Sequence, residues 1–164
     1  MRKILVFSLV FFFLSLMQTS FFFHFNLYGI VPNTILVLVV LVNFLEKKEK
    51  NSGLAIAAIG GFFLDLFSFL PLGISVVLLF IIALLIKRAL KFLIEENIVH
   101  FVLILFFSFL FYNFFSVLVN SLLNLSFPCF FLWNEIIIIE LFYNLLLGTA
   151  FYLLVLCSRK ISRK

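Results

Sequence analysis

Asp65 and Glu140 are acidic residues inside long apolar stretches of the sequence, GGFFLDLFSFLPLG (60–73) and IIIIELFYNLLLG (136–148). A charged side chain at the centre of a bilayer costs about 3 kcal/mol on insertion scales, so each carboxylate needs a partner or a function. Together the two carboxylates could bind a proton or a cation, which is the chemistry of a transporter. Neither stretch supplies a second spaced carboxylate on the same helix or a set of metal ligands, so the sequence supports this interpretation only weakly.

Small residues recur at helical spacing around Asp65. Ala57, Gly61 and Asp65 follow one another at i, i+4 and i+8, and Ser68 lies close to the same line. Small side chains let a neighbouring helix approach closely, and this line directs the carboxylate toward that neighbour. Asp65 also has a purely structural interpretation, in which it lies near the outer surface and accepts hydrogen bonds from the turn at Pro71.

Two later stretches carry polar lines of the same kind, Asn113, Ser116 and Asn120 in one, and Glu140, Asn144 and Gly148 in the other. The economical packing turns these lines inward, which predicts a candidate polar interior formed by Asn113, Asn120, Glu140 and Asn144. Structural alternatives stay open here as well. Asparagines commonly join helices in membranes, and Glu140 is near enough to a helix start to be wetted or to interact with the helix dipole.

The composition is that of an integral membrane protein. Of the 164 residues, 66% are hydrophobic and only 12% charged, and the mean hydropathy is +1.34. The apolar stretches match the roughly 20 residues of a spanning helix and are too long for barrel strands. We therefore predict an all-α, polytopic transmembrane bundle of about six helices, forming a single membrane domain over 1–164. No CxxC, HExxH, GxSxG, Walker or GxGxxG pattern occurs, so we expect no enzyme activity, cofactor or metal.

The predicted helices cover residues 4–23, 27–45, 54–70, 72–86, 98–123 and 136–157. Pro32 falls in the first turns of the second helix, where its missing N–H is tolerated. The third and fourth are short and separated only by Pro71, so they either span a thinned bilayer or form a re-entrant hairpin. Residues 87–97 have the pattern of a short amphipathic helix lying in the interface.

Basic residues predict the orientation of this bundle. All 12 Lys and Arg fall at the N-terminus, within 46–53, within 87–97, or at the C-terminus. With six helices these segments share one side, so both termini should be cytoplasmic. The formal net charge of +5 therefore indicates how the protein is oriented in the membrane. We expect the protein to interact with the lipid bilayer and not with nucleic acid.

Residues 60–91, GGFFLDLFSFLPLGISVVLLFIIALLIKRALK, resemble the signature region of the MreD family of rod shape-determining membrane proteins. The resemblance lies in Gly61, Leu64, Asp65, Ser68, Leu72, Gly73 and Ser75. VPNTILVLVVLV (31–42) is similar to the opening of that family's second helix, with Pro32 followed by Asn33 where an aspartate is common.

The resemblance implies a non-enzymatic scaffold and regulator of the cell-wall elongation machinery in the bacterial inner membrane. It would control cell shape and peptidoglycan synthesis together with MreC, and indirectly with MreB, RodA and the elongation-specific penicillin-binding transpeptidase. Gly61, Asp65, Ser68, Pro71, Gly73, Pro32 and Asn33 would then be structural or partner-interface residues. We hypothesise that the Asp65 carboxylate holds the Pro71–Gly73 turn, and with it the face that binds MreC.

A rival function follows from the same resemblance, because the family fold is similar to the substrate-binding subunits of energy-coupling-factor transporters. A vitamin-type substrate-binding membrane subunit would need an internal pocket, lined in this chain by Asn113, Asn120, Glu140 and Asn144.

Overall fold

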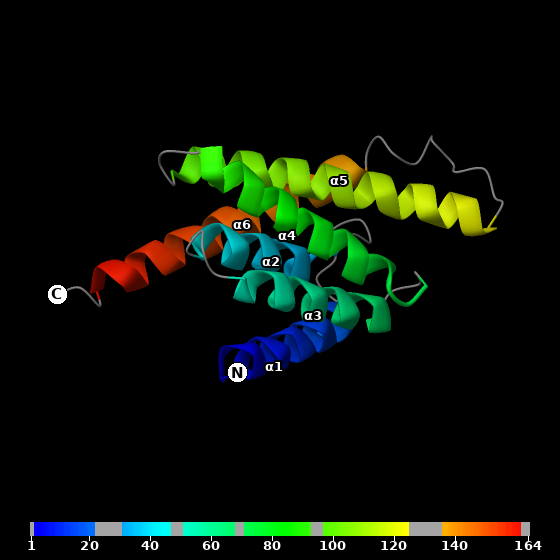
Figure 1. Ribbon diagram of the computed structural model, residues 1–164, viewed down its shortest axis with the longest axis horizontal. Helices are drawn as coiled ribbons and strands as arrows, with labels where there is room; N and C mark the ends of the chain where they lie inside the picture. Colours follow the sequence, from blue (N-terminus) through cyan, green and yellow to red (C-terminus); the bar gives the residue numbers. More distant parts are fainter. Residues whose placement is uncertain are drawn as a thin grey trace.

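The protein is described by a computed structural model, which covers residues 2–21, 31–46, 51–67, 71–92, 97–124 and 136–161. These residues form α1 (Arg2–Leu16) with the short π-helix η1 (Met17–Phe21), α2 (Thr34–Leu45), α3 (Ser52–Phe67), α4 (Ile74–Phe92), α5 (Ile98–Asn124) and α6 (Ile136–Ile161). No strand occurs within them, so the predicted all-helical fold is confirmed. Successive helices alternate in direction, and α1 begins at the end of the bundle where α6 finishes (Figure 1).

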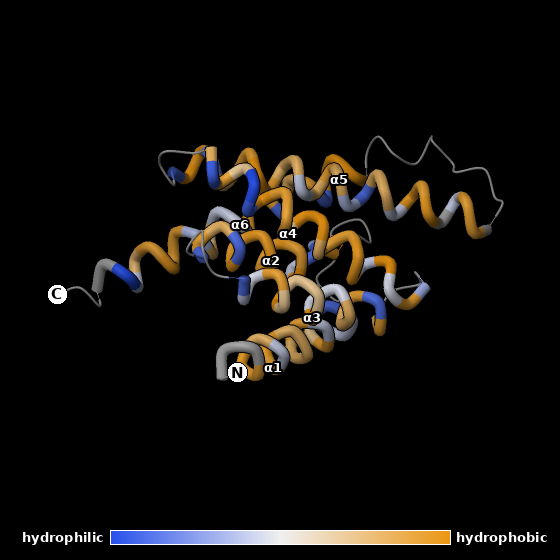
Figure 2. The backbone as a smooth tube through the Cα atoms, in the orientation of Figure 1, coloured by the Kyte–Doolittle hydropathy of each residue, from blue (hydrophilic) through white to orange (hydrophobic). Residues whose placement is uncertain are grey.

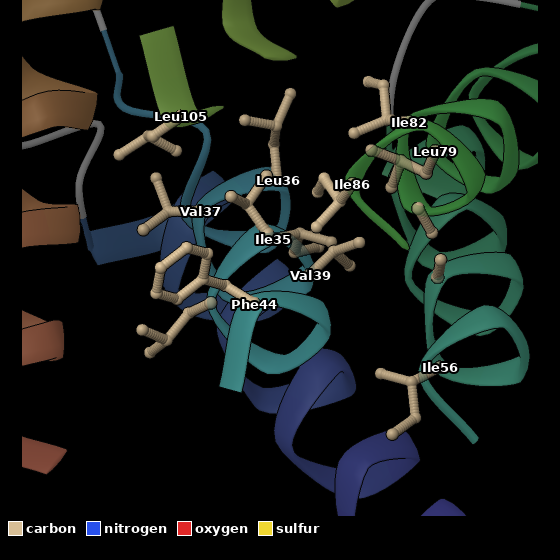
Figure 3. Packing of buried hydrophobic residues seen from close by; sticks show 14 of the residues in the cluster. Ile35, Leu36, Val37, Val39, Phe44, Ile56, Leu79, Ile82, Ile86 and Leu105 are labelled. Atoms are coloured by element: carbon tan, nitrogen blue, oxygen red, sulfur yellow. The ribbon is translucent and has the colours of Figure 1, made fainter. Parts of the chain in front are cut away.

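α2 lies at the centre of the bundle. It contacts each of the other five α-helices, and nine of its 12 residues are buried. Apart from Thr34 and Asn43 it is apolar on every side, which is the pattern of a helix surrounded by protein. Figure 3 shows Ile35, Leu36, Val37 and Val39 among side chains of α4 and α5. At the other end of α2, Phe44 meets Phe101 and Tyr152 at centroid distances of 5.3 and 6.0 Å.

The start of α2 differs from the sequence prediction. A helix over 27–45 was expected, whereas α2 begins at Thr34, and residues 27–30 lie outside the described ranges. Asn33 is the cap, because its side chain accepts a hydrogen bond of 3.1 Å from the Leu36 N–H. Pro32 therefore precedes the helix and is not in its first turn. Gln18 of η1 fixes this start, since its amide donates to the Pro32 carbonyl at 2.9 Å.

The end of α4 also corrects the sequence analysis. Residues 87–92 continue α4 and do not begin a separate interfacial helix, while 93–96 lie outside the described ranges. The reason is packing, because Leu90 is fully buried and extends the core line of Ile82 and Ile86 by one more turn. With 19 residues, α4 is about 28 Å long, against about 24 Å for the 16 residues of α3.

α5 and α6 contain stretches long and apolar enough to cross a membrane, Ile98–Leu123 and Ile137–Arg159. Bulky apolar side chains cover their outer faces. Phe107 and Phe142 are 64% and 68% exposed, and the tube in Figure 2 is hydrophobic along most of both helices. Side chains of this size on the surface fit a hydrocarbon environment better than water.

Candidate functional site: a carboxylate clamp between α3 and α4

Asp65 lies near the end of α3 and is only 3% exposed. Its carboxylate accepts hydrogen bonds from the backbone N–H groups of Gly73 at 2.7 Å, Ser75 at 2.9 Å and Val76 at 3.4 Å. α4 begins at Ile74, so the latter two N–H groups belong to its first turn and have no partner within the helix. Asp65 thus caps α4 from a neighbouring helix, where a negative charge also complements the helix dipole.

The turn between the two helices is shaped to bring these N–H groups to Asp65. The Ile74 N–H donates to the Pro71 carbonyl at 3.3 Å, and the Val77 N–H donates to the Gly73 carbonyl at 3.0 Å. Gly73 has φ of +103°, a conformation that side-chain-bearing residues rarely adopt. Pro71 and Gly73 are therefore parts of the clamp. Ser68, the other residue predicted for this region, lies outside the described ranges.

Gly61 lies one turn before Asp65 and lets the two helices touch. A Cβ atom at this position would be 2.6 Å from both the Ser75 carbonyl oxygen and the Val76 nitrogen, which are backbone atoms. Ala57, one turn earlier still, is fully buried. The close approach predicted from Ala57, Gly61 and Asp65 is thus confirmed, and the neighbour is α4.

A hydroxyl pair extends the clamp to α5. Ser75 is fully buried, and its Oγ lies 3.0 Å from the Tyr112 hydroxyl. Sequence reasoning missed Tyr112, because a tyrosine among phenylalanines is usually a packing residue. The one available signal was its position directly before Asn113 on the polar line.

The predicted polar interior is only partly assembled. Asn144 is fully buried, yet neither atom of its amide has a hydrogen-bond partner in the part of the chain that the structure describes. Asn113 is half-buried and donates to the Phe109 carbonyl of its own helix at 3.3 Å. Glu140 is half-buried, and Asn120 belongs to α5, with its side chain outside the description. No hydrogen bond joins any two of these residues whose side chains are described.

An open groove of about 610 Å³ lies elsewhere, between α4 and α5. Its walls are apolar except for Ser108, and none of the four predicted polar residues lines it. The lining residues are Ile82, Leu85, Ile86, Ala89, Ile104, Phe107, Ser108, Leu110, Phe111, Phe114 and Phe115.

A second carboxylate clamp joins the other ends of these helices. Glu46, directly after α2, forms an ion pair with Lys87 of α4 at 3.0 Å and accepts hydrogen bonds from the Gly53 N–H at 2.8 Å and from the Ser52 hydroxyl. Burial alone would raise the pKa of Glu46, but these hydrogen bonds and the Lys87 charge outweigh it, and the pKa falls below its usual value. From the sequence, Glu46 was only the first residue of the segment 46–53, and no partner was predicted for it.

The described residues contain no group of three or more His, Cys, Asp or Glu side chains that could hold a metal ion. Comparisons with known protein families, with curated proteins and with solved structures give no significant match to this chain.

Proposed function

We propose that this protein is a multi-pass scaffold of the bacterial inner membrane, with both termini cytoplasmic, that acts in cell-wall elongation. In this proposal it regulates peptidoglycan synthesis and cell shape together with MreC, as the resemblance to the MreD family implies. The observation that carries the proposal is the α3–α4 clamp. Four residues of the resembling motif, Gly61, Asp65, Gly73 and Ser75, belong to this one structural unit.

The clamp suits a structural role for Asp65 better than a chemical one. Both oxygens of its carboxylate accept backbone N–H groups of the turn and of α4, and the side chain is almost fully buried. A general acid or base must reach the proton that it transfers, which this position does not favour. A carboxylate used in this way fixes the angle between two helices and hence the surface that they present to a partner.

The membrane location is supported by the outer faces and by the charges. The helix ends that carry Arg2, Lys87, Arg88 and Arg159 lie at one end of the bundle (Figure 1). A cytoplasmic location for this end agrees with the positive-inside rule.

The test is affinity purification from gently solubilised native membranes through a C-terminal tag, followed by mass spectrometry. Recovery of MreC and the wall synthases is the expected result. Asp65→Leu should reduce that recovery, whereas Leu66→Ala, at the exposed neighbouring position, should not. Normal assembly and normal cell shape with both Asp65→Asn and Asp65→Leu would contradict the role of the clamp.

Asn144 favours one alternative, the substrate-binding subunit of a vitamin-type transporter. A fully buried amide without partners costs roughly 1–3 kcal/mol, and a bound polar solute could supply the missing hydrogen bonds. This function predicts thermal stabilisation of the purified protein by a vitamin-sized ligand and co-purification of an ATPase pair with a membrane coupling subunit. Recovery of those partners without MreC would replace the scaffold proposal.

A further inference from the structure

Glu140 and Asn144 lie one turn apart on α6, and each lacks the partner that its chemistry requires. Asn144 is fully buried, and neither its Nδ2 nor its Oδ1 atom has a hydrogen-bond partner in the described part of the chain. Glu140 is half-buried and forms no ion pair or hydrogen bond among the described residues. Side chains at i and i+4 are neighbours on a helix, so one ligand can reach both of them.

The face of α6 that carries these two residues is turned into the bundle. A Cβ atom at Gly148, one turn after Asn144, would meet Leu105 of α5 and lie 3.5 Å from Val37 of α2. Asn144 on the same face is therefore enclosed by α6 and its neighbours. Long side chains of a helix lean toward its N-terminus, so the Asn144 amide is directed toward the turn that holds Glu140.

The Glu140 carboxylate has no positive side chain near it in the sequence or at its end of the bundle. No lysine or arginine occurs from residue 98 to residue 158. Glu140 is near the start of α6, whereas the helix ends that carry the described basic residues lie at the opposite end of the bundle (Figure 1). An unpaired charge among apolar helices is costly, so the counter-charge must come from outside the chain.

We propose that Glu140 and Asn144 bind a monovalent metal cation between the Glu140 carboxylate and the Asn144 carbonyl oxygen. Carboxylate and amide oxygens are ligands that hard cations prefer. One positive charge neutralises one carboxylate, whereas a divalent ion would leave a net charge in apolar surroundings. This inference rests on the membrane location proposed above, but not on a role in wall synthesis.

The cation accounts for both unsatisfied groups together. A neutral solute could bind the Asn144 amide but would leave the Glu140 charge unpaired. A second carboxylate is not needed, and Asp65, which the sequence suggested for this purpose, is already held by three backbone N–H groups. The two side chains do not hydrogen-bond each other, although their spacing on the helix would allow it, and a bridging ion requires this separation.

The experiment measures sodium binding to the purified full chain in detergent. Equilibrium dialysis with radioactive sodium should show about one bound ion per chain. Replacing choline chloride by sodium chloride at constant ionic strength should raise the melting temperature by about 3 °C or more, once sodium is tenfold above its dissociation constant. Glu140→Gln should abolish both effects, and Asn144→Leu should weaken binding about tenfold or more.

Thr149→Val is the control on the same helix, because the Thr149 hydroxyl donates to the Leu146 carbonyl at 2.9 Å and belongs to no site. It should leave sodium binding unchanged. In sodium-free buffer, Glu140→Gln should melt no lower than the parent chain, since it removes an unpaired charge, and this shows that the variant folds. Asn144→Leu, which replaces the amide by an apolar group of similar volume, carries the test should Glu140→Gln fail to fold.

Absence of bound sodium and potassium between pH 6 and pH 8 would overturn the proposal. A melting temperature that depends on pH but not on sodium, with the dependence lost in Glu140→Gln, would show that a proton occupies the site instead. Tighter binding of calcium than of sodium or potassium would contradict the charge argument. Failure to recover MreC would count against the scaffold proposal but not against this cation site.

Discussion

At the scale of single residues, Asp65 and Asn144 represent opposite solutions for a buried polar side chain. The Asp65 carboxylate has three backbone donors, and the Asn144 amide has no partner among the described residues. Both side chains are almost fully buried, so the difference in hydrogen bonding comes from the groups that surround each of them. Asp65 meets a helix start, where N–H groups are available, whereas Asn144 lies within a helix and must find a side chain, water or ligand.

Asp65→Leu should destabilise the folded protein by roughly 3 kcal/mol, because it leaves buried N–H groups of α4 without an acceptor. Asp65→Asn should cost less, about 1–2 kcal/mol, since one amide oxygen can still accept while the NH₂ group faces donors. Denaturant unfolding in mixed micelles measures both. Leu66→Ala, at the exposed neighbouring position, is the control and should change stability little. An equal loss for Asn and Leu would mean that the charge, and not hydrogen bonding, carries the effect.

Gly61→Ala and Gly73→Ala should act through different mechanisms. The methyl group at position 61 meets the backbone of Ser75 and Val76, which cannot move aside without separating α3 from α4, so we expect a loss of about 2–3 kcal/mol. At position 73 nothing lies within 4 Å, and only the positive φ is strained, which costs about 1–2 kcal/mol. Unfolding free energies of the two variants test this order. A larger loss at position 73 would show that the turn, and not the close approach, limits stability.

At the scale of elements, the sequence predicted the helices and the contact line of α3, but not where capping begins or ends a helix. The apolar pattern could not locate the start of α2, because it already runs through residues 27–31. Asn33 decides that start by bonding the Leu36 N–H. The pattern over 87–92 equally fits an interfacial helix, and only the neighbours that bury Leu90 make it part of α4. Tyr112 and Glu46 were missed because their partners are distant in sequence.

The Glu46–Lys87 clamp should make the contact between α2, α3 and α4 depend on pH. The pKa of Glu46 is lower in the folded protein than in the unfolded chain, so its carboxylate stabilises the fold at neutral pH. That contribution is lost as the pH falls from 4.5, the ordinary pKa of a glutamate side chain, through the lower pKa of the folded protein. Glu46→Gln should reduce stability by roughly 1–2 kcal/mol at pH 7 and should flatten the acid side of the profile.

A double-mutant cycle with Glu46→Gln and Lys87→Met measures how strongly the two side chains are coupled. Melting temperatures between pH 3 and pH 7 in the same detergent supply the pH profile, with Arg88→Met as the control for loss of a nearby charge. Additive effects of the two substitutions would show that the ion pair contributes nothing beyond the separate hydrogen bonds of Glu46.

At the scale of the whole molecule, the α3–α4 turn distinguishes the two membrane arrangements that the sequence left open. If α3 and α4 span the bilayer, Leu72 lies at the outer surface, because its turn is at the end of the bundle opposite the start of α1 (Figure 1). If they re-enter, Leu72 lies within the membrane. Leu72 is 72% exposed, so a cysteine at this position can react wherever water reaches it.

Leu72→Cys, in a variant that lacks the two native cysteines, should react with a membrane-impermeant maleimide on intact spheroplasts. Ser162→Cys, near the C-terminus, should react only after permeabilisation, because the proposed orientation places the basic helix ends in the cytoplasm. The length of α4, about 28 Å, favours spanning over re-entry, because it nearly matches a hydrocarbon core of about 30 Å. Protection of Leu72→Cys before and after permeabilisation would establish the re-entrant hairpin. The clamp at Asp65 would then hold a turn inside the membrane. There, each backbone N–H group of the turn that lost the carboxylate would cost several kcal/mol.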